Sequence, residues 1–469
     1  MLAGCATSRR ADMAEKHPSV EGGLMLRTNI QGEPTQTFDV YERMKRYRVP
    51  AVSVAVIQNG KVSWTATYEL PSPTSGKMSE RTMFQAASIS KSVTGLLAAR
   101  LAQAGKVDLD ANVDAYLAPL QLPPGKQTPA NPVTLRKLLS HTAGATVSGF
   151  PGYKPGSAIP TTDQVVLGQA PAITPAVTID TAPGSKYTYS GGGYTLLQLA
   201  LERHVDMTFE QLMKQWVLDP LSMNHSTFAQ PLPASAPAHA SGHFFDGTEV
   251  EGGAYVYPEE AAAGLWTTPE DLANLLIAIR HAALEGGPFL SSASAQEMLT
   301  PKLNNYAFGV FVVGEGERRR FMHSGGNAGF KSTYVMFLGS GNGVVVMTNG
   351  DNGSYLGGEF VKAVAMAYHW PDFRPRDAVP AAVDHDVAAA HLGSYRYEKF
   401  EGRFPNRVVL AKQGSDWSLV LPDLGPVRIV PTGPLSFVAP ETGETIEMSS
   451  GQELPFLMIG GRKATLVAR

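Results

Sequence analysis

The sequence contains little cysteine, little charge and no long apolar run. One cysteine among 469 residues excludes a disulfide framework and a cysteine-rich zinc or iron–sulfur site. Charged residues make up 17%, with 39 basic against 42 acidic and no long block of either sign. This excludes the basic footprint of a nucleic-acid binder. No stretch approaches the roughly 18 apolar residues of a spanning helix. A loop-rich, globular enzyme or binding protein of two or three domains remains.

The single cysteine lies in the motif Leu2-Ala3-Gly4-Cys5, which resembles a bacterial lipobox, and a polar stretch follows it. The charged and hydrophobic parts of a secretion signal are missing from this sequence. Two interpretations stay open. Either Cys5 is lipidated and anchors an envelope or periplasmic lipoprotein whose start has been removed, or the match is chance and the protein is cytoplasmic.

The main part of the chain has alternating strands at both ends and helical periodicity between them. Val52–Gln58 and Lys61–Thr67 flank Asn59-Gly60, a typical type I′ hairpin turn. We expect helices at 88–104, 194–205, 208–218 and 269–285, and late strands at 306–313, 319–323, 332–338 and 343–348. The pattern predicts an α+β fold in which early and late strands share one antiparallel sheet.

The composition changes after residue 370. Three prolines within 370–380 indicate a linker, which we place at 371–385. The segment 386–469 shows seven or so short strands separated by turn pairs, and therefore predicts a small antiparallel barrel or sandwich with a structural role. These boundaries leave an N-terminal tail at 1–24 and a main domain at 25–370.

The sharpest chemical signal is Ser88-Ile89-Ser90-Lys91, the only Ser-x-x-Lys in the chain. Residues three apart share one helix face, so the lysine lies one turn from the serine. A serine in the first helical turn has its hydroxyl at the positive end of the dipole. Lys91 can accept its proton where burial favours the neutral amine. An N-cap serine with a solvated lysine is the alternative, but the flanking residues are small or apolar and argue against it.

Two further clusters contain polar groups at strand ends. Tyr189-Ser190-Gly191 precedes a helix, and Tyr189 could shuttle a proton between a nucleophile and a leaving group. His323-Ser324-Gly325-Gly326 ends a strand, and its small residues would let backbone N–H groups approach a substrate oxyanion. Taken singly, each is as well explained by a core tyrosine and an ordinary hydrogen-bonded histidine.

The order of the three motifs resembles the penicillin-recognising serine hydrolases. The chain is similar to the class C β-lactamase-related group of DD-peptidases, D-aminopeptidases and family VIII carboxylesterases over residues 35–365. Segments 138–144, 264–272 and 344–351 are also typical of this group. His141 lies in one of these and is expected to be structural. The resemblance implies a β-lactamase/transpeptidase-like domain with a helical subdomain, and a lipocalin-like C-terminal barrel.

The same resemblance implies roles for individual residues. Ser88 would be the acylated nucleophile, Lys91 its proton partner and Tyr189 the second acid/base. The N–H groups of Ser88 and Gly326 would form the oxyanion hole. The residues expected to contact substrate are His323, which takes the place of the lysine in Lys-Thr-Gly, together with Ser324, Gly325 and Gly191. Neither a cofactor nor a metal is implied.

Two departures from the family narrow the expected substrate. Gly191 stands where many relatives have the asparagine of Tyr-x-Asn, and no Lys-Thr-Gly or Lys-Ser-Gly occurs. A site without those hydrogen-bonding groups recognises a β-lactam weakly. We expect an esterase or amidase acting on small acyl substrates. A D-amino-acid or cell-wall peptidase at the envelope is the alternative, and a non-catalytic module with the same fold is a third hypothesis. The sequence does not predict an oligomeric state.

Overall fold

The computed structural model describes residues 17–71, 77–398, 406–450 and 454–468. Cys5, the expected lipidation site, lies outside them. None of the helices in these ranges is both long and apolar enough to cross a membrane.

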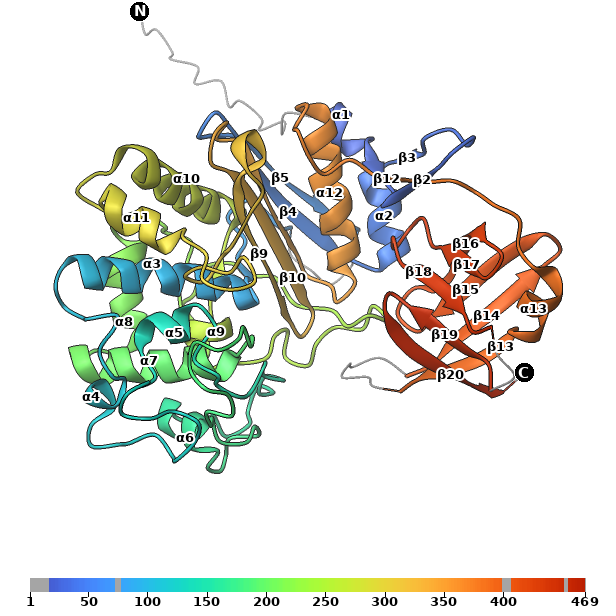
Figure 1. The fold of residues 1–469 in the computed structure, drawn as a ribbon. Coiled ribbons are helices and arrows are strands. Elements are labelled where there is room, and N and C mark those ends of the chain that lie inside the picture. Colours follow the sequence, from blue (N-terminus) through green and yellow to red (C-terminus); the bar gives the residue numbers. More distant parts are fainter. Residues whose placement is uncertain (1–16, 72–76, 399–405, 451–453, 469) are drawn as a thin grey trace, which may run out of the picture.

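A six-stranded antiparallel sheet forms the centre of the main domain (Figure 1). Its order is β5 (Lys61–Glu69), β4 (Ala51–Gln58), β11 (Gly343–Thr348), β10 (Phe330–Phe337), β9 (Arg320–Asn327) and β8 (Phe311–Val313). The prediction that early and late strands share one sheet is therefore confirmed. Asn59 and Gly60 both adopt positive φ, 50° and 73°, as a type I′ turn requires.

Helices cover both faces of the sheet (Figure 1). On one face lie α12 (Gly353–Ala367), α2 (Val40–Tyr47) and α1 (Pro18–Glu21). On the other lie α10 (Pro269–Glu285), α3 (Ser90–Gln103) and α11 (Ser292–Met298). Helix α10 has the range expected from the sequence, and Thr268 caps it by accepting a hydrogen bond from the Asp271 N–H.

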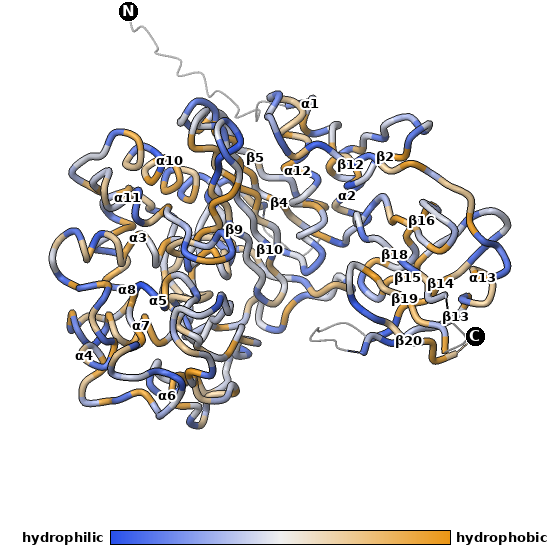
Figure 2. The backbone as a smooth tube through the Cα atoms, viewed as in Figure 1, coloured by the Kyte–Doolittle hydropathy of each residue, from blue (hydrophilic) through white to orange (hydrophobic). Residues whose placement is uncertain are grey.

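A helical subdomain extends from the α3 side (Figure 1). It contains α4 (Asp114–Leu117), α5 (Leu135–Leu139), α6 (Thr162–Leu167), α7 (Gly191–Val205), α8 (Phe209–Met213) and α9 (Glu260–Ala263). Long loops connect these short helices. Figure 2 shows apolar stretches along the central strands, and one continuous core joins the sheet, α3, α7 and α10.

The C-terminal segment forms a closed antiparallel barrel (Figure 1). Its strands are β13 (Gly393–Tyr397), β14 (Val408–Gln413), β15 (Asp416–Leu421), β16 (Gly425–Gly433), β17 (Ser436–Val438), β18 (Thr445–Met448), β19 (Phe456–Ile459) and β20 (Arg462–Ala468). The predicted barrel is confirmed, with eight strands where seven or so were expected. Alternate side chains fill its interior, and the core continues into α2 and α12.

Several segments are more, or less, regular than the sequence suggests. The expected linker contains β12 (Arg376–Ala378), which pairs in parallel with β2 (Thr28–Ile30), and α13 (His385–Ala390) follows it. In the expected tail, α1 is followed by β1 (Leu24–Met25), which pairs with β3 (Thr37–Phe38). Local composition does not reveal such pairing, because each partner is remote in sequence. Conversely, only 311–313 of the expected strand 306–313 is a strand.

Candidate active site

Ser88 and Lys91 lie where a short 3₁₀ turn (η1, Ala87–Ile89) leads into α3. The Lys91 Nζ lies 3.1 Å from the Ser88 Oγ and donates to the Ala262 carbonyl at 2.7 Å. Ser88 is half-buried, whereas Lys91 is only 2% exposed. This burial agrees with the small and apolar residues that flank Lys91 in the sequence. The predicted pair is therefore in contact.

Aromatic rings, rather than carboxylates, surround the Lys91 amine. Its Nζ lies 5.1 Å from the centroid of the Tyr189 ring and 5.6 Å from that of Tyr194. None of the ion pairs in the described ranges includes Lys91. A carboxylate partner would hold the amine in its protonated form. The arrangement keeps the amine in contact with the Ser88 oxygen without such a partner.

Tyr189 occupies the extended segment before α7 (Gly191–Val205), as predicted. The next residue, Ser190, caps α7 through the Gly193 N–H, and its own N–H donates to the Nδ1 of His141 at 3.1 Å. The His141 ring packs against Tyr189 at 4.3 Å between centroids. Burial, together with the charge of Lys91, holds the pKa of His141 well below its usual value. This neutral histidine positions the tyrosine segment, in agreement with its expected structural role.

The edge of β9 offers a backbone donor next to Ser88. In the β9–β10 hairpin, Asn327 pairs with Phe330 across a two-residue turn, and Gly326 is opposite Lys331. Because bonded and non-bonded pairs alternate from the turn, the Gly326 N–H points away from β10. Strand β8 pairs only with residues 320–322 of β9, so the edge at Gly326 is open. The N–H of Ser88 makes no hydrogen bond with the described residues. Both predicted oxyanion donors are thus available.

Gly325 allows β9 to pass directly beside the nucleophile. A Cβ at this position would lie 2.1 Å from the Ala86 carbonyl oxygen and 2.9 Å from the Ser88 nitrogen. Any side chain would therefore push the strand away from the start of α3. Ser324, in contrast, is exposed on the opposite face of the strand.

His323 is buried and fully bonded within the protein. Its Nδ1 lies 2.7 Å from the Ser324 carbonyl, which only accepts, so Nδ1 carries the proton and Nε2 accepts from the Tyr306 hydroxyl at 3.2 Å. Burial and Lys91 lower the pKa of His323 to about 3. The expected contact of His323 with an acidic or polar end of the substrate is therefore corrected: this neutral ring offers neither a charge nor a free nitrogen.

Gly191 is also not placed as expected. It is buried, and a Cβ there would lie 2.8 Å from the Phe150 ring. Phe150 therefore fills the space beside Gly191, and the expected direct contact of Gly191 with substrate is corrected. An aromatic ring stands near the position where many relatives present an amide.

Sequence reasoning missed four supporting groups: Tyr306, the Ala262 carbonyl, and the pair Gln85 and Asn327. The Asn327 Nδ2 donates to the Gln85 Oε1 at 2.7 Å, which ties the end of β9 to β6 (Phe84–Gln85), directly before Ser88. No local pattern identifies them, because each acts through a partner that is distant in sequence.

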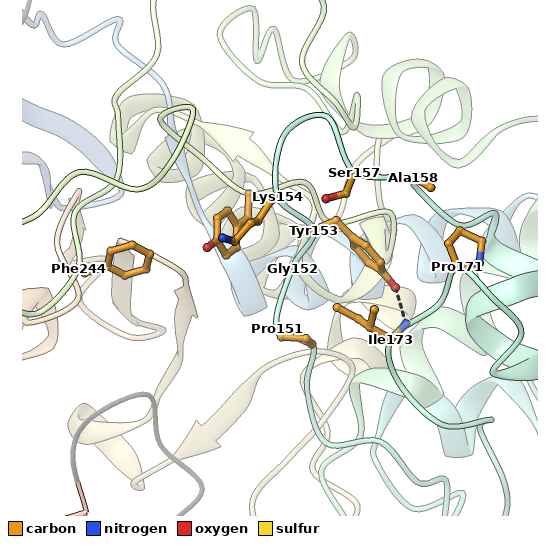
Figure 3. A pocket seen from close by; sticks show the side chains of 10 residues that line it. Pro151, Gly152, Tyr153, Lys154, Ser157, Ala158, Pro171, Ile173 and Phe244 are labelled. Atoms are coloured by element: carbon orange, nitrogen blue, oxygen red, sulfur yellow. Dashed lines mark hydrogen bonds between the residues drawn. The ribbon is translucent and has the colours of Figure 1, made fainter.

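An apolar cavity of about 540 Å³ lies among the loops that connect to these segments (Figure 3). It is lined by Pro151, Gly152, Tyr153, Lys154, Ser157, Ala158, Pro171, Ile173, Phe244 and Tyr255. The Gln85 Nε2 donates to the Tyr255 carbonyl at 2.8 Å, and Pro151 directly follows Phe150. Two cavity walls are therefore attached to the segments that carry Ser88 and cover Gly191. The lining residues all come from the loops 145–180 and 230–262.

The family model described as Beta-lactamase matches residues 39–362, more than half of the chain. The chain belongs to this family. It is a β-lactamase-fold member of the penicillin-recognising serine hydrolases, as its motifs indicated.

Curated relatives are distant. The chain is 25% identical over 338 residues to Protein flp of Staphylococcus aureus (strain MW2), covering 69% of this chain and 64% of the relative. It therefore spans less than two thirds of that protein. It is 25% identical over 342 residues to Penicillin-binding protein 4* of Bacillus subtilis (strain 168), covering 67% of this chain and 72% of the relative.

Solved structures share the fold along most of the chain. An octameric penicillin-binding protein homologue from Pyrococcus abyssi aligns with a TM-score of 0.60 and 20% identity, covering 91% of this chain and 98% of its own. SurE aligns with a TM-score of 0.55 and 21% identity, covering 91% and 97%. The 91% coverage extends the likeness beyond the 39–362 region.

Proposed function

We propose that this protein is a serine acyl-hydrolase that works through an acyl-enzyme on esters and small amides with an apolar acyl group. The observation that carries the proposal is the 3.1 Å contact between the Ser88 Oγ and the Lys91 Nζ, next to two unused backbone donors. This geometry provides a nucleophile, a proton acceptor and an oxyanion site at one helix start.

In acylation, the Ser88 oxygen attacks the substrate carbonyl carbon while its proton passes to the Lys91 amine. The N–H groups of Ser88 and Gly326 stabilise the negative carbonyl oxygen of the tetrahedral intermediate. The bond to the leaving group then breaks, and Tyr189 supplies the proton that the leaving group requires. Lys91 returns its proton to Tyr189, which leaves an ester on Ser88.

Deacylation uses the same groups in the reverse direction. Water loses a proton to the neutral Lys91 amine, with Tyr189 passing on its own proton and taking the one from water, and attacks the ester carbonyl, while the same two N–H groups stabilise the oxyanion. Ser88 leaves and regains its proton, so the enzyme returns to its starting state. No cofactor is needed to balance either half of the reaction.

The surroundings of the site support an apolar acyl group. The rings of Tyr189 and His323 both lie against that of Tyr306, which supports a proton donor at the His323 end of the open β9 edge. A leaving group near that donor would direct the acyl group toward Asn327 and on to Tyr255, which lines the apolar cavity. Neutral His323 offers no charge to the carboxylate of a β-lactam, which supports weak activity on such compounds.

A series of p-nitrophenyl esters, from acetyl to octanoyl and benzoyl, tests the proposal, together with fluorophosphonate labelling read by intact mass. We expect turnover by the unaltered protein, one label per chain, and loss of both in Ser88→Ala. Ser185→Ala, which changes an exposed serine of the nearby loop, is the matched control and should keep both. Full labelling of Ser88→Ala would refute the assignment.

Tyr189→Phe provides a second test of the mechanism, because it removes only the phenolic proton. We expect ester turnover to fall by about 10²–10⁴, the usual contribution of a positioned acid or base. Near-normal turnover in this variant would remove Tyr189 from the mechanism.

A D-amino-acid or cell-wall peptidase is the second candidate. It is supported by the names of relatives: a penicillin-binding protein, SurE solved with D-Leu, and a β-lactamase/D-alanine carboxypeptidase from Yersinia pestis (TM-score 0.51, 19% identity). Lipidation at Cys5 would place such an enzyme at the envelope. Cleavage of D-Ala-terminated peptides in preference to esters would favour it. Inertness toward esters, amides, peptides and lactams alike would favour the non-catalytic module.

A further inference from the structure

One wall of the substrate cavity belongs to a loop that the C-terminal barrel helps to hold. Phe244 lines the cavity across from Tyr153 and Pro171 (Figure 3), and its ring meets Tyr255 edge-on at 6.4 Å between centroids. The loop around it closes on itself, since the Phe244 N–H donates to the Thr248 carbonyl at 2.8 Å. The position of Phe244 therefore depends on what anchors this short loop.

On its inner side, the loop is attached to the hairpin of the oxyanion strand. The His243 N–H donates to the Gly329 carbonyl, and the His243 carbonyl accepts from the Asp351 N–H. Asp351 in turn accepts from the Gly329 N–H at 3.0 Å. These bonds fix the base of the loop but do not reach the residues on the far side of Phe244.

On its outer side, the loop is attached to the barrel through two side chains. The Arg48 Nη1 donates to the Phe245 carbonyl at 3.3 Å and to the Asp423 carbonyl at 3.1 Å. The Asn352 Nδ2 donates to the same two carbonyls, at 3.0 and 3.3 Å. Asp423 lies in the barrel turn between β15 and β16, and Tyr355 donates to its side chain at 3.0 Å. Two side chains thus join one cavity loop to one barrel turn.

From this geometry we infer that the barrel is a specificity element: through Arg48 and Asn352, it holds Phe244 as a wall of the acyl cavity. The inference rests on the proposed function, because it assigns the cavity to the acyl group. Arg48 and Asn352 are positioning residues. They contact the backbone next to Phe244 and not the reacting atoms, so their loss should change which acyl group is preferred while the Ser88 chemistry persists.

The test compares kcat and KM of full-length variants on acetyl and benzoyl p-nitrophenyl esters. In Phe244→Ala, we expect the preference for the benzoyl ester to fall by about tenfold, mainly through KM. The double variant Arg48→Ala/Asn352→Ala should lose about threefold to tenfold of that preference with kcat on the acetyl ester retained. The single variant Arg48→Lys keeps one donor at this position and leaves Asn352 intact. It should keep more of the benzoyl preference than the double variant does.

Arg46→Ala is the matched control. Arg46 binds the barrel through Glu441 and the carbonyls of Leu424 and Pro426 but makes no bond to the cavity loop. This variant should lower the melting temperature without changing acyl preference. If the double variant keeps the unaltered benzoyl preference, or if Arg46→Ala changes that preference equally, the inference is wrong while the proposed function stands. If the unaltered protein hydrolyses no ester, both are overturned.

Discussion

Two regions of this molecule bury a basic side chain, but the groups that accept its hydrogen bonds differ: carboxylates in one region and uncharged oxygens in the other. Where the barrel meets the main domain, Arg43 makes two bonds to Glu359, at 2.9 and 2.8 Å, and a third to Glu441 at 2.9 Å. The Tyr47 hydroxyl also donates to Glu359. At the candidate active site, Lys91 is buried to a similar degree, yet a serine oxygen and a carbonyl accept its bonds.

This difference agrees with different roles: Arg43 and Glu359 stabilise the fold, whereas Lys91 is proposed to transfer a proton. A buried ion pair is tolerated when each charge has an opposite partner with good geometry. Such a partner would also hold a lysine in one protonation state. The domain interface can use fixed charges, whereas the proposed mechanism requires Lys91 to exchange a proton, and none of the ion pairs of the described residues includes it.

Lys91→Met tests this comparison most directly, with the largest expected effect. The methionine keeps the length of the side chain but cannot accept the Ser88 proton, so ester kcat/KM should fall by about 10²–10⁴. Because a buried amine without a carboxylate partner is removed, the melting temperature should rise. Steady-state kinetics and calorimetry measure the two effects. A variant that loses stability together with activity would show that Lys91 is also structural.

Arg43→Met should give the opposite result at the domain interface. Removing one partner leaves Glu359 buried without its main counter-charge, which should cost about 3–5 kcal/mol of the free energy of unfolding. Urea unfolding measures this loss, and ester kcat should remain within about twofold. The double variant Arg43→Met/Glu359→Gln should recover part of the lost stability. No recovery would mean that the arginine acts through packing alone.

Glu259 extends the comparison to a carboxyl with no partner, with the smallest effect of the three. It is 0% exposed and, within the described part of the chain, neither side-chain oxygen has a hydrogen-bond partner, so burial raises its pKa to about 8 from an ordinary 4.5. The folded state therefore keeps this proton to a higher pH than the unfolded state. The free energy of unfolding should fall between about pH 4.5 and pH 8 and level off above.

Glu259→Gln removes this titration. Melting temperatures measured from about pH 5 to pH 9 should fall less steeply in the variant than in the unaltered protein. Converted to the free energy of unfolding, the loss over this range should be smaller in the variant by on the order of a few kcal/mol. Asp246→Asn, which changes an exposed acid of a nearby loop, is the control and should leave the slope almost unaltered. If the melting temperatures of Glu259→Gln and of the unaltered protein change with pH in parallel, the raised pKa of Glu259 is contradicted.

Much of the site could be predicted, because its chemistry depends on local spacing. Ser88 and Lys91 are three residues apart at a helix start. The small residues Gly325 and Gly326 in β9 likewise indicate, from the sequence alone, a strand that another segment can approach closely. His323 and Gly191 were assigned to substrate from their positions in the motifs. The structure corrected both, because Tyr306 engages the histidine ring and Phe150 covers the glycine. Neither neighbour is close in sequence to the residue that it changes.

The same division holds for the fold. The Asn59-Gly60 hairpin and α10 follow from local rules, since turn geometry and helix capping involve adjacent residues. Strand β12 was read as part of a linker because three prolines surround it, and only its pairing with β2 makes it a strand. Proline content indicates the local backbone conformation of a segment, but it does not indicate which distant strand the segment pairs with.

The sequence alone determined the family, the Ser-x-x-Lys pair, the antiparallel sheet shared by both ends of the main domain, and the C-terminal barrel. Tertiary structure decided that Lys91 has no carboxylate partner among the described residues, that the nitrogens of His323 are occupied, and that Arg48 and Asn352 join the loop of Phe244 to a turn of the barrel. The physical reason is range. Periodicity, capping and turn chemistry act over a few residues, whereas burial, protonation and pocket shape depend on which distant segments pack together.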